Sequence, residues 1–188
     1  EKLIQNRILS KEEFVELLSN TSAEDREILR KEAVRLREKY YGHDVYIRGL
    51  IEFTNYCKNN CYYCGIRRDN HHLERYRLTK DEILSCCEGG YRLGYRTFVL
   101  QGGEDPWFND GRMEDIVRSI RAAYPECAIT LSIGERSRES YQRLKEAGAD
   151  RYLLRHETAN EAHYRKLHPE EMSLANRKAC LYTLKELG

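Results

Sequence analysis

The sequence has no long apolar run. None of its hydrophobic stretches approaches the roughly 20 residues that a membrane-spanning helix needs. The first residues, Glu1 to Arg7, also lack the apolar core of a signal peptide. We therefore expect a cytoplasmic protein without a membrane partner, or an organellar one if the source is eukaryotic.

The chain also has little net charge and no biased segment. Its 32 Lys and Arg residues stand against 31 Asp and Glu residues, which gives a net charge of +1 at pH 7. This balance gives no indication of a nucleic-acid partner. No linker or low-complexity stretch marks a second folded domain. With 40% hydrophobic residues in 188, the composition is typical of a globular protein with one core.

A disulfide framework is not indicated either, because the seven cysteines are odd in number and three of them are clustered. Cys57, Cys61 and Cys64 lie within eight residues. Thiolates so close together form a disulfide, bind a metal ion or hold an iron–sulfur cluster. Three cysteines on a four-iron cluster would leave one iron without a protein ligand, and an open coordination position leaves room for chemistry.

The spacing Cys-x3-Cys-x2-Cys, with Tyr63 before the last cysteine, resembles the cluster loop of the radical S-adenosylmethionine (SAM) enzymes. In that family the open iron binds the amino and carboxylate groups of SAM, and reduction cleaves SAM to methionine and a 5′-deoxyadenosyl radical. The alternative is a zinc knuckle with His71 or His72 as the fourth ligand. In that case the chain would be a non-catalytic zinc- or cluster-binding module.

The order of predicted elements indicates an α/β fold. Capping boxes at Ser10–Glu13 and Thr79–Glu82 mark two helix starts. We predict helices over 10–18, 23–41, 79–94, 112–123, 137–148 and 174–187, and strands over 45–54, 97–101, 128–133 and 151–157. Two helices followed by four strand–helix units predict parallel strands with the helices outside.

A complete (β/α)8 barrel of the TIM type typically needs about 250 residues. We therefore interpret residues 1–44 as an N-terminal helical extension. Residues 45–188 are then the first four βα units of a barrel that is apparently truncated at its C-terminus. Active sites of such barrels lie at the C-terminal ends of the strands.

The second predicted strand ends in Gly102, Gly103 and Glu104. Glycines allow the backbone to approach a ligand closely, although a Gly-Gly pair alone is more often an ordinary turn. After a cysteine unit, this run resembles the Gly-Gly-Glu motif of radical SAM enzymes. The resemblance implies that its carbonyls and carboxylate accept hydrogen bonds from the SAM ammonium group.

The third strand alternates, so that Thr130 and Ser132 are predicted to face the barrel interior, opposite the apolar Ile129, Leu131 and Ile133. Polar residues near the end of a strand suggest a ligand site, and a hydroxyl satisfied by the backbone explains them equally well.

On the fourth strand, Arg155 and Glu157 share one face and His156 lies on the other. We expect either the pair or the histidine to be buried inside the barrel. A buried ion pair is a costly core element and suits a site for a carboxylate and a ribose, with a structural ion pair as the alternative. Arg177, at the start of the last helix, could bind a carboxylate with two hydrogen bonds, although a lone arginine on a helix is usually solvated.

Five segments together resemble the HydE family, the radical SAM maturases of [FeFe]-hydrogenase: Arg48–Cys57, Cys64–Asn70, Arg75–Thr79, Val99–Pro106 and Asp150–Asn160. The run Arg-His-Glu-Thr-Ala-Asn points to this family rather than to the related biotin synthases and methylornithine synthases. Those relatives remain the alternative.

The resemblance implies a [4Fe-4S] cluster on Cys57, Cys61 and Cys64, with SAM as co-substrate. Gly102, Gly103 and Glu104 would bind the SAM amino group. Tyr63 would contact the adenine, Glu157 the ribose and Arg177 the methionyl carboxylate, and Ser132 would belong to the same site. Thr130 and Arg155 would face the substrate.

The implied role is assembly of the diiron subsite of the hydrogenase H-cluster in an anaerobic setting. The substrate would be a small organometallic or cysteine-derived species delivered by another maturase. Chains of this family are longer, so residues of later strands would complete the site, and we expect weak or no turnover from these 188 residues alone.

Overall fold

The computed structural model describes residues 1–188, which form two compact units, Glu1–Tyr46 and Ile47–Gly188. The first unit contains α1 (Lys2–Asn6), α2 (Lys11–Asn20) and α3 (Ala23–Tyr41). As predicted, α2 begins at a capping box formed by Ser10 and Glu13. Helix α3 ends at Gly42, whose φ of 61° lies in the left-handed region that favours glycine. Helix α1 was not predicted.

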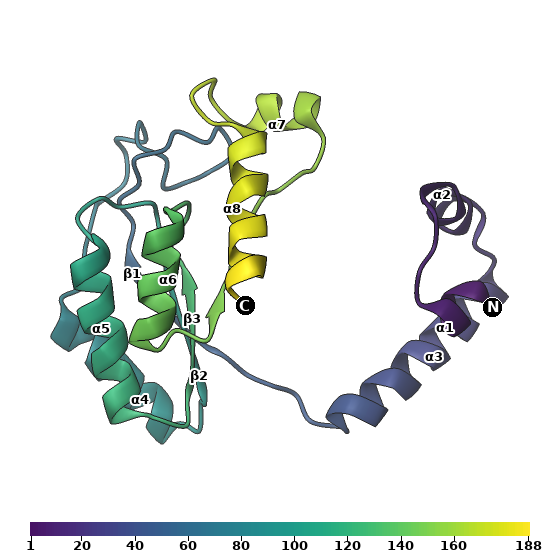
Figure 1. The fold of residues 1–188 in the computed structure, drawn as a ribbon, viewed down its shortest axis with the longest axis horizontal. Coiled ribbons are helices and arrows are strands. Elements are labelled where there is room, and N and C mark those ends of the chain that lie inside the picture. The colour runs from purple at the N-terminus through teal and green to yellow at the C-terminus, as the bar shows by residue number, and fades with distance from the viewer. The chain divides into compact units, whose positions relative to one another are not determined.

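The second unit is a parallel four-stranded sheet with helices packed on it (Figure 1). Its strands are β1 (Gly49–Thr54), β2 (Thr97–Gly102), β3 (Ala128–Ser132) and β4 (Arg151–Tyr152). Its helices are α4 (Lys80–Arg92), α5 (Asp110–Ala123), α6 (Arg138–Ala147), α7 (Glu161–Leu167) and α8 (Leu174–Leu187). The strands stand in sequence order, β1-β2-β3-β4, and each neighbouring pair is parallel, which confirms the predicted arrangement.

The core lies between one face of this sheet and the helices. Ile129, Leu131 and Ile133 are at most 3% exposed and pack in the main hydrophobic cluster with Leu100 of β2 and Val117 of α5. The apolar face of the third strand was therefore predicted correctly. Burial of these side chains supplies the main driving force that holds the helices on the sheet.

The opposite face carries a polar row that runs across three strands. Glu52 pairs in register with Gln101, and Gln101 with Ser132, so these three residues form one row near the C-terminal edge. Thr130 belongs to the row below, where it pairs with Val99. The C-terminal edge of the sheet is thus polar on the face that the core does not use.

Two predicted strands are shorter than expected. The first begins at Gly49, because Val45 and Ile47 are exposed and have no strand partner. The fourth pairs with β3 only at Arg151 and Tyr152, not over 151–157. Its partner β3 ends at Ser132 and the chain then turns at Gly134 (φ 80°), so the residues after Leu153 have no strand beside them.

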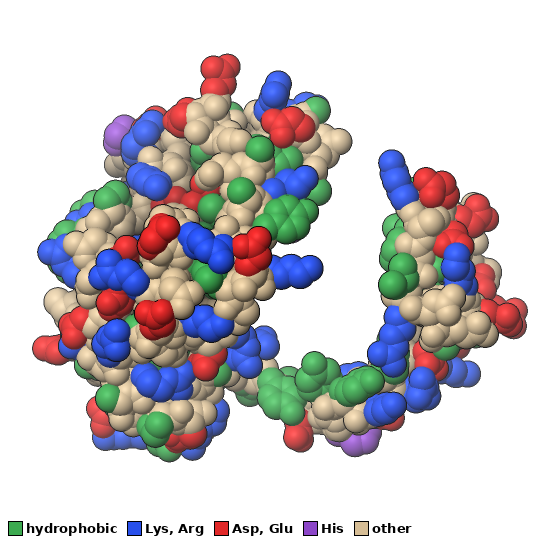
Figure 2. Space-filling view, viewed as in Figure 1, with side chains coloured by type: hydrophobic (Ala, Val, Ile, Leu, Met, Phe, Trp, Pro, Cys, Tyr) green, Lys and Arg blue, Asp and Glu red, His purple; other side chains and the backbone are tan.

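The remaining boundaries differ little from the prediction. Helix α5 starts at Asp110 rather than at 112, because Asn109 caps it, and α8 has the predicted bounds. Helix α7 was missed. None of the helices combines the length and apolar character needed to cross a membrane. On the visible face of the second unit, Lys and Arg side chains are interspersed with Asp and Glu, as the net charge of +1 leads one to expect (Figure 2).

Candidate active site

A cavity of about 230 Å³ lies at the C-terminal edge of the sheet. Eleven of the twelve residues predicted for the site line it. They are Cys57, Cys61, Tyr63, Cys64, Gly102, Gly103, Glu104, Ser132, Arg155, Glu157 and Arg177. They come from the ends of all four strands and from the start of α8, because parallel strands bring their C-terminal ends to one edge.

The three clustered cysteines are free, half-buried thiols on the loop after β1. His71 and His72 do not line the cavity that the cysteines line. Three thiols and no histidine therefore line this cavity. Such a donor set fits a cluster with one open iron position better than a zinc knuckle that takes a histidine as its fourth ligand.

Two of these thiols, Cys57 and Cys61, have raised pKa values, which favours the protonated form. Burial first, and then the neighbouring Cys57 and Cys64, raise the pKa of Cys61 to about 11. Burial also raises the pKa of Cys57. A metal centre binds thiolate, so its positive charge would replace these protons.

The Gly-Gly-Glu loop packs directly against the cysteine loop. A Cβ atom on Gly103 would lie 2.1 Å from the carbonyl oxygen of Tyr56 and 2.7 Å from the Cβ of Cys57. The backbone N–H of Lys58 donates to the carbonyl of Glu104 at 2.9 Å. The glycine thus allows close approach to the loop that carries the thiols, and the predicted approach to a ligand stays a prediction.

Arg177 lies between two carboxylates in the wall of the cavity. Its side chain is 8% exposed, with Nε 2.8 Å from Glu135 Oε1 and Nη2 3.5 Å from Glu104 Oε1. Lys58 Nζ lies 3.4 Å from the other oxygen of Glu104. Gly134 gives Glu104 its room, because a Cβ there would lie 1.9 Å from Glu104 Cγ. Sequence reasoning missed Glu135, although its place just after the third strand could have indicated it.

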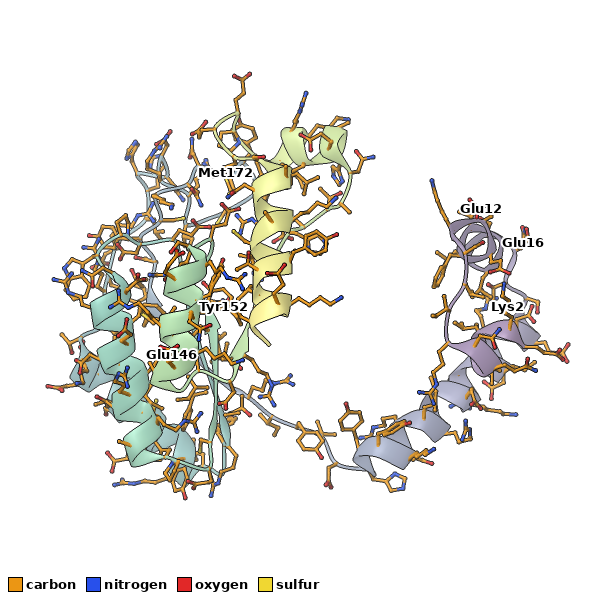
Figure 3. The ribbon with its side chains drawn as sticks, viewed as in Figure 1. Lys2, Glu12, Glu16, Glu146, Tyr152 and Met172 are labelled. Atoms are coloured by element: carbon orange, nitrogen blue, oxygen red, sulfur yellow. The ribbon has the colours of Figure 1, made fainter.

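The segment from α7 to α8 covers the cysteine loop. The hydroxyl of Tyr63 is 3.4 Å from His168 Nε2, and His168 is 4% exposed and stacks on Tyr164 at 3.9 Å. Met172, just before the start of α8 (Figure 3), places its sulfur 3.6 Å from that of Cys61. Because α7 was not predicted, His168 and Met172 were not found from the sequence.

The end of the fourth strand differs from the prediction. Arg155, His156 and Glu157 are all exposed, so the expectation that either the pair or the histidine is buried was wrong. The reason is that β4 ends at Tyr152 and the chain then leaves the sheet, with Glu157 at a φ of 61°. Arg155 donates from Nη2 to Gln101 Oε1 at 3.2 Å. His156 does not line the cavity.

Thr130 is the predicted residue that the cavity does not include. It is buried, at 9% exposure, one row deeper in the sheet than Ser132. Its predicted contact with a substrate stays a prediction.

Two aspartates fix the loops around the cavity, and the first is the buried Asp105. Its side chain is 1% exposed, and it accepts hydrogen bonds from Arg77 Nε at 2.6 Å and Thr54 Oγ1 at 2.9 Å. Burial raises the pKa of Asp105, but these hydrogen bonds outweigh burial and hold it below its usual value. Arg77 also stacks over the ring of Tyr56 at 3.7 Å. Asp105 therefore ties the Gly-Gly-Glu loop to the end of β1.

The second aspartate, Asp110, supports the loop that carries Glu135. It accepts hydrogen bonds from Arg136 Nη1 at 2.8 Å and from Ser140 Oγ at 2.6 Å. Burial raises the pKa of Asp110, and the two hydrogen bonds more than reverse that effect. The pairing connects the start of α5 to the loop before α6.

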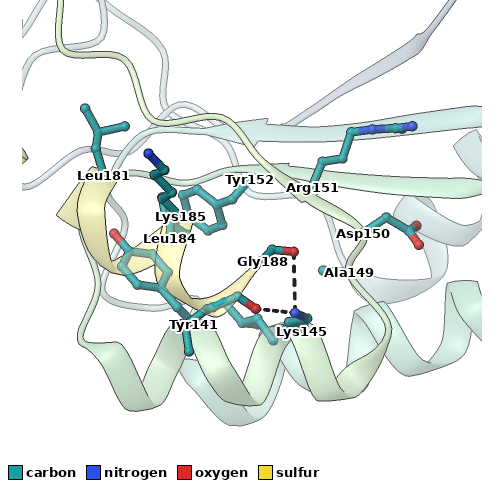
Figure 4. A pocket seen from close by; sticks show the side chains of 12 residues that line it. Tyr141, Lys145, Ala149, Asp150, Arg151, Tyr152, Leu181, Leu184, Lys185 and Gly188 are labelled. Atoms are coloured by element: carbon teal, nitrogen blue, oxygen red, sulfur yellow. Dashed lines mark hydrogen bonds between the residues drawn. The ribbon is translucent and has the colours of Figure 1, made fainter.

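A separate cavity of about 350 Å³ lies between α6, β4 and α8 (Figure 4). Leu144, Leu181 and Leu184 line much of it, and Lys145 donates to the carbonyls of Leu187 and Gly188. It shares no residue with the first cavity and contains none of the predicted site residues.

A parallel α/β sheet with three thiols and a Gly-Gly-Glu loop at its C-terminal edge has the plan of a radical SAM barrel. Residues 51–188 match the family model "Radical SAM superfamily". The chain therefore belongs to the radical SAM superfamily, a family of enzymes that use a [4Fe-4S] cluster and SAM.

Two curated relatives are similar over most of the chain. The "[FeFe] hydrogenase maturase subunit HydE" of Thermotoga maritima is 50% identical over 185 residues, which are 98% of this chain and 52% of that protein. A 3-methylornithine synthase of Methanosarcina acetivorans is 31% identical over 169 residues, covering 89% and 48%. The chain thus spans about half the length of these relatives, and the predicted resemblance to HydE is confirmed.

Solved structures agree with this assignment. All of the chain superposes on 55% of the methylornithine synthase PylB with a TM-score of 0.85 and 30% identity. It also superposes on 43% of HydG, a maturase of the [FeFe]-hydrogenase, with a TM-score of 0.88 and 25% identity. These matches confirm the predicted fold, in which the four βα units fit the N-terminal part of a (β/α)8 barrel.

Proposed function

We propose that the chain is the cluster- and SAM-binding part of a HydE-type maturase, which acts in assembly of the diiron subsite of the [FeFe]-hydrogenase H-cluster. The observation that carries the proposal is the convergence of three thiols, the Gly-Gly-Glu loop and Arg177 on one cavity, in a chain 50% identical to HydE. The 31% identity to methylornithine synthase is lower, so a synthase of that type is the second candidate.

In this proposal Cys57, Cys61 and Cys64 hold the [4Fe-4S] cluster. When bound, the cluster supplies the electron that cleaves SAM to methionine and a 5′-deoxyadenosyl radical. The side chains of His168 and Met172 contact the cysteine loop at Tyr63 and Cys61 and would limit the access of water to it.

The other cavity residues bind and orient SAM. The carboxylate of Glu104 and the carbonyls of Gly102 and Gly103 accept hydrogen bonds from its ammonium group, and the guanidinium of Arg177 binds its carboxylate. Ser132 and Glu157 lie at the ends of the next two strand units, where Glu157 would bind the ribose while Tyr63 contacts the adenine. All of these residues line the cavity.

The substrate is proposed to be a small organometallic or cysteine-derived molecule, supplied by another hydrogenase maturase in the cytoplasm. Arg155 and the polar row of Glu52 and Gln101 face the cavity from the sheet side. Thr130 would contact the substrate from the row below. We also propose that residues 1–44 form a helical extension separate from the barrel part, residues 45–188.

Anaerobic reconstitution with iron and sulfide tests the proposal. We expect about four irons per chain and cleavage of SAM on reduction. Cys61→Ala should lose the cluster and keep its fold. The matched control is Cys86→Ala, because Cys86 is an exposed free cysteine on α4 and does not line the cavity.

Iron content that is unchanged in Cys61→Ala would contradict the ligand assignment, and tight zinc binding without iron would contradict the enzyme class. Activation of apo-hydrogenase by the full-length protein separates the maturase from the synthase. Formation of 3-methylornithine without such activation would favour the second candidate.

A further inference from the structure

We propose that Arg75 is a positioning residue that sets the arrangement of the three thiols by holding both ends of the loop that carries them. The proposal rests on the proposed function, in which these thiols bind the cluster. Arg75 does not line the cavity, so its action would be through the backbone of the loop.

The guanidinium of Arg75 donates to four backbone carbonyls. Nη1 contacts the carbonyl oxygens of Asn55 and of Ile66, the latter at 2.9 Å. Nη2 contacts those of Arg67 at 2.7 Å and Asn70 at 3.2 Å. Asn55 stands two residues before Cys57, and Ile66 stands two residues after Cys64. One side chain therefore joins the two ends of the cysteine loop.

The backbone around Arg75 is itself anchored to the sheet. The side chain of Asn55, which is 8% exposed, donates to the carbonyl of Glu74 at 2.7 Å and accepts from the N–H of Tyr76 at 2.8 Å. Two residues further on, Arg77 pairs with Asp105 at 2.6 Å. The guanidinium thus starts from a fixed point beside β1 and reaches into the loop.

The loop needs such a support because it has no regular secondary structure between β1 and α4. Its internal backbone hydrogen bonds close turns, such as the one from Cys64 N–H to the carbonyl of Cys61 at 3.1 Å. The planar guanidinium carries several fixed donors, whereas a lysine ammonium is a single donor atom that cannot span four carbonyls. The role we assign is therefore geometric and depends on the fork rather than on the charge.

The test compares Arg75→Lys with Arg121→Lys in the metal-free protein and after reconstitution. Arg121 is a matched control, because it also donates to several carbonyls, those of Pro125, Cys127 and Gly148, at 2.7–2.9 Å. It does not line the cavity. The readout is amide hydrogen exchange of Lys58, Cys64 and Arg68, whose N–H groups are hydrogen-bonded within or next to the loop. Their exchange rates report on whether Arg75 holds the loop in place.

We expect these amides to exchange about tenfold faster or more in Arg75→Lys, as for the loss of one or two net hydrogen bonds, and at the wild-type rate in Arg121→Lys. The reconstituted Arg75→Lys protein should release iron to a chelator faster and show an altered EPR signal of the reduced cluster. If Arg75→Lys does not fold, Arg75→Gln, which keeps two N–H donors, is measured by the same criteria.

Unchanged exchange in the loop would overturn the proposal, and so would faster exchange with an unchanged EPR signal and iron release. If the wild-type protein assembles no cluster, the proposed function fails by itself. In that case, faster amide exchange of the loop in the Arg75 variant alone would still support the role of Arg75 in holding the loop.

Discussion

Replacing Gly103 with alanine tests whether the contact between the Gly-Gly-Glu loop and the cysteine loop shapes the site. The added Cβ would lie 2.1 Å from the carbonyl oxygen of Tyr56 and 2.7 Å from Cys57 Cβ. Both distances are far below van der Waals contact, and the first partner is backbone, which cannot rotate away. The two loops would have to move apart by about 1 Å, and overpacking of this kind costs about 1–3 kcal/mol.

Two smaller terms accompany this strain. Separation of the loops weakens the hydrogen bond from Lys58 N–H to the Glu104 carbonyl, worth about 1 kcal/mol net. The lower entropy of the unfolded alanine chain opposes the loss by about 0.4–1 kcal/mol. The expected net loss of stability is about 2 kcal/mol, which corresponds to a fall in Tm of about 6 °C for a unit of this size.

The matched control is Gly89→Ala. Gly89 is exposed in the last turn of α4, and nothing lies within 4 Å of its added Cβ. Because alanine is a better helix former, this variant should gain about 0.5–1 kcal/mol. The two glycine substitutions are therefore expected to shift stability in opposite directions.

The assay is thermal and urea unfolding of the metal-free protein, followed by iron analysis after anaerobic reconstitution. Gly103→Ala should melt lower and bind less iron, because the displaced backbone carries Cys57. A Gly103→Ala protein that melts within 1 °C of the wild type, with full iron content, would refute the reasoning. Loss of iron in both glycine variants would refute the assignment of that loss to the loop contact.

Two further predictions concern the charges around the cavity. In Asp110→Asn, the stability lost relative to wild type should be largest above pH 5 and shrink as the pH falls below about 4, the usual carboxyl pKa. The reason is that the pKa of Asp110 is lowered in the folded state, so only its ionised form stabilises the fold. Urea unfolding from pH 3 to 7 measures this difference in stability, and a difference that does not change with pH would contradict the prediction. Arg177→Lys should weaken SAM binding by about tenfold or more, because an ammonium cannot make the bidentate contact with a carboxylate. Calorimetry on the reconstituted protein measures the affinity, and Arg118→Lys on the exposed face of α5 is the control. Equal affinities of the Arg177 variant and the wild type would count against the role of Arg177.

The elements and residues that could be predicted from the sequence depend on local interactions or on the parallel topology. The starts of α2 and α4 follow from capping boxes closed within four residues. Cys57, Glu104 and Ser132 could be placed on one cavity, because each lies at or just after the end of a parallel strand and such strands end at a common edge.

The parts that were missed depend on contacts between residues far apart in the sequence. Tyr63 and His168 are 105 residues apart, and Thr54 and Asp105 are 51 apart. Nothing local to either partner indicates such a pair. The fourth strand was predicted too long for a related reason. The alternation of side chains expected of a strand continues to Glu157, but β3 pairs only with the start of that segment.

The pairing of Arg177 with Glu104 has a consequence for how a zwitterion would enter the cavity. The two side chains are 10% exposed or less and stand 3.5 Å apart, so each now neutralises the other. In the proposed function, the methionine end of SAM brings one ammonium for Glu104 and one carboxylate for Arg177. The exchange therefore leaves every buried charge with a partner. A buried charge without a partner would be costly. Glu135, 2.8 Å from Arg177 Nε, and Lys58, 3.4 Å from Glu104, can hold both side chains in place throughout the exchange.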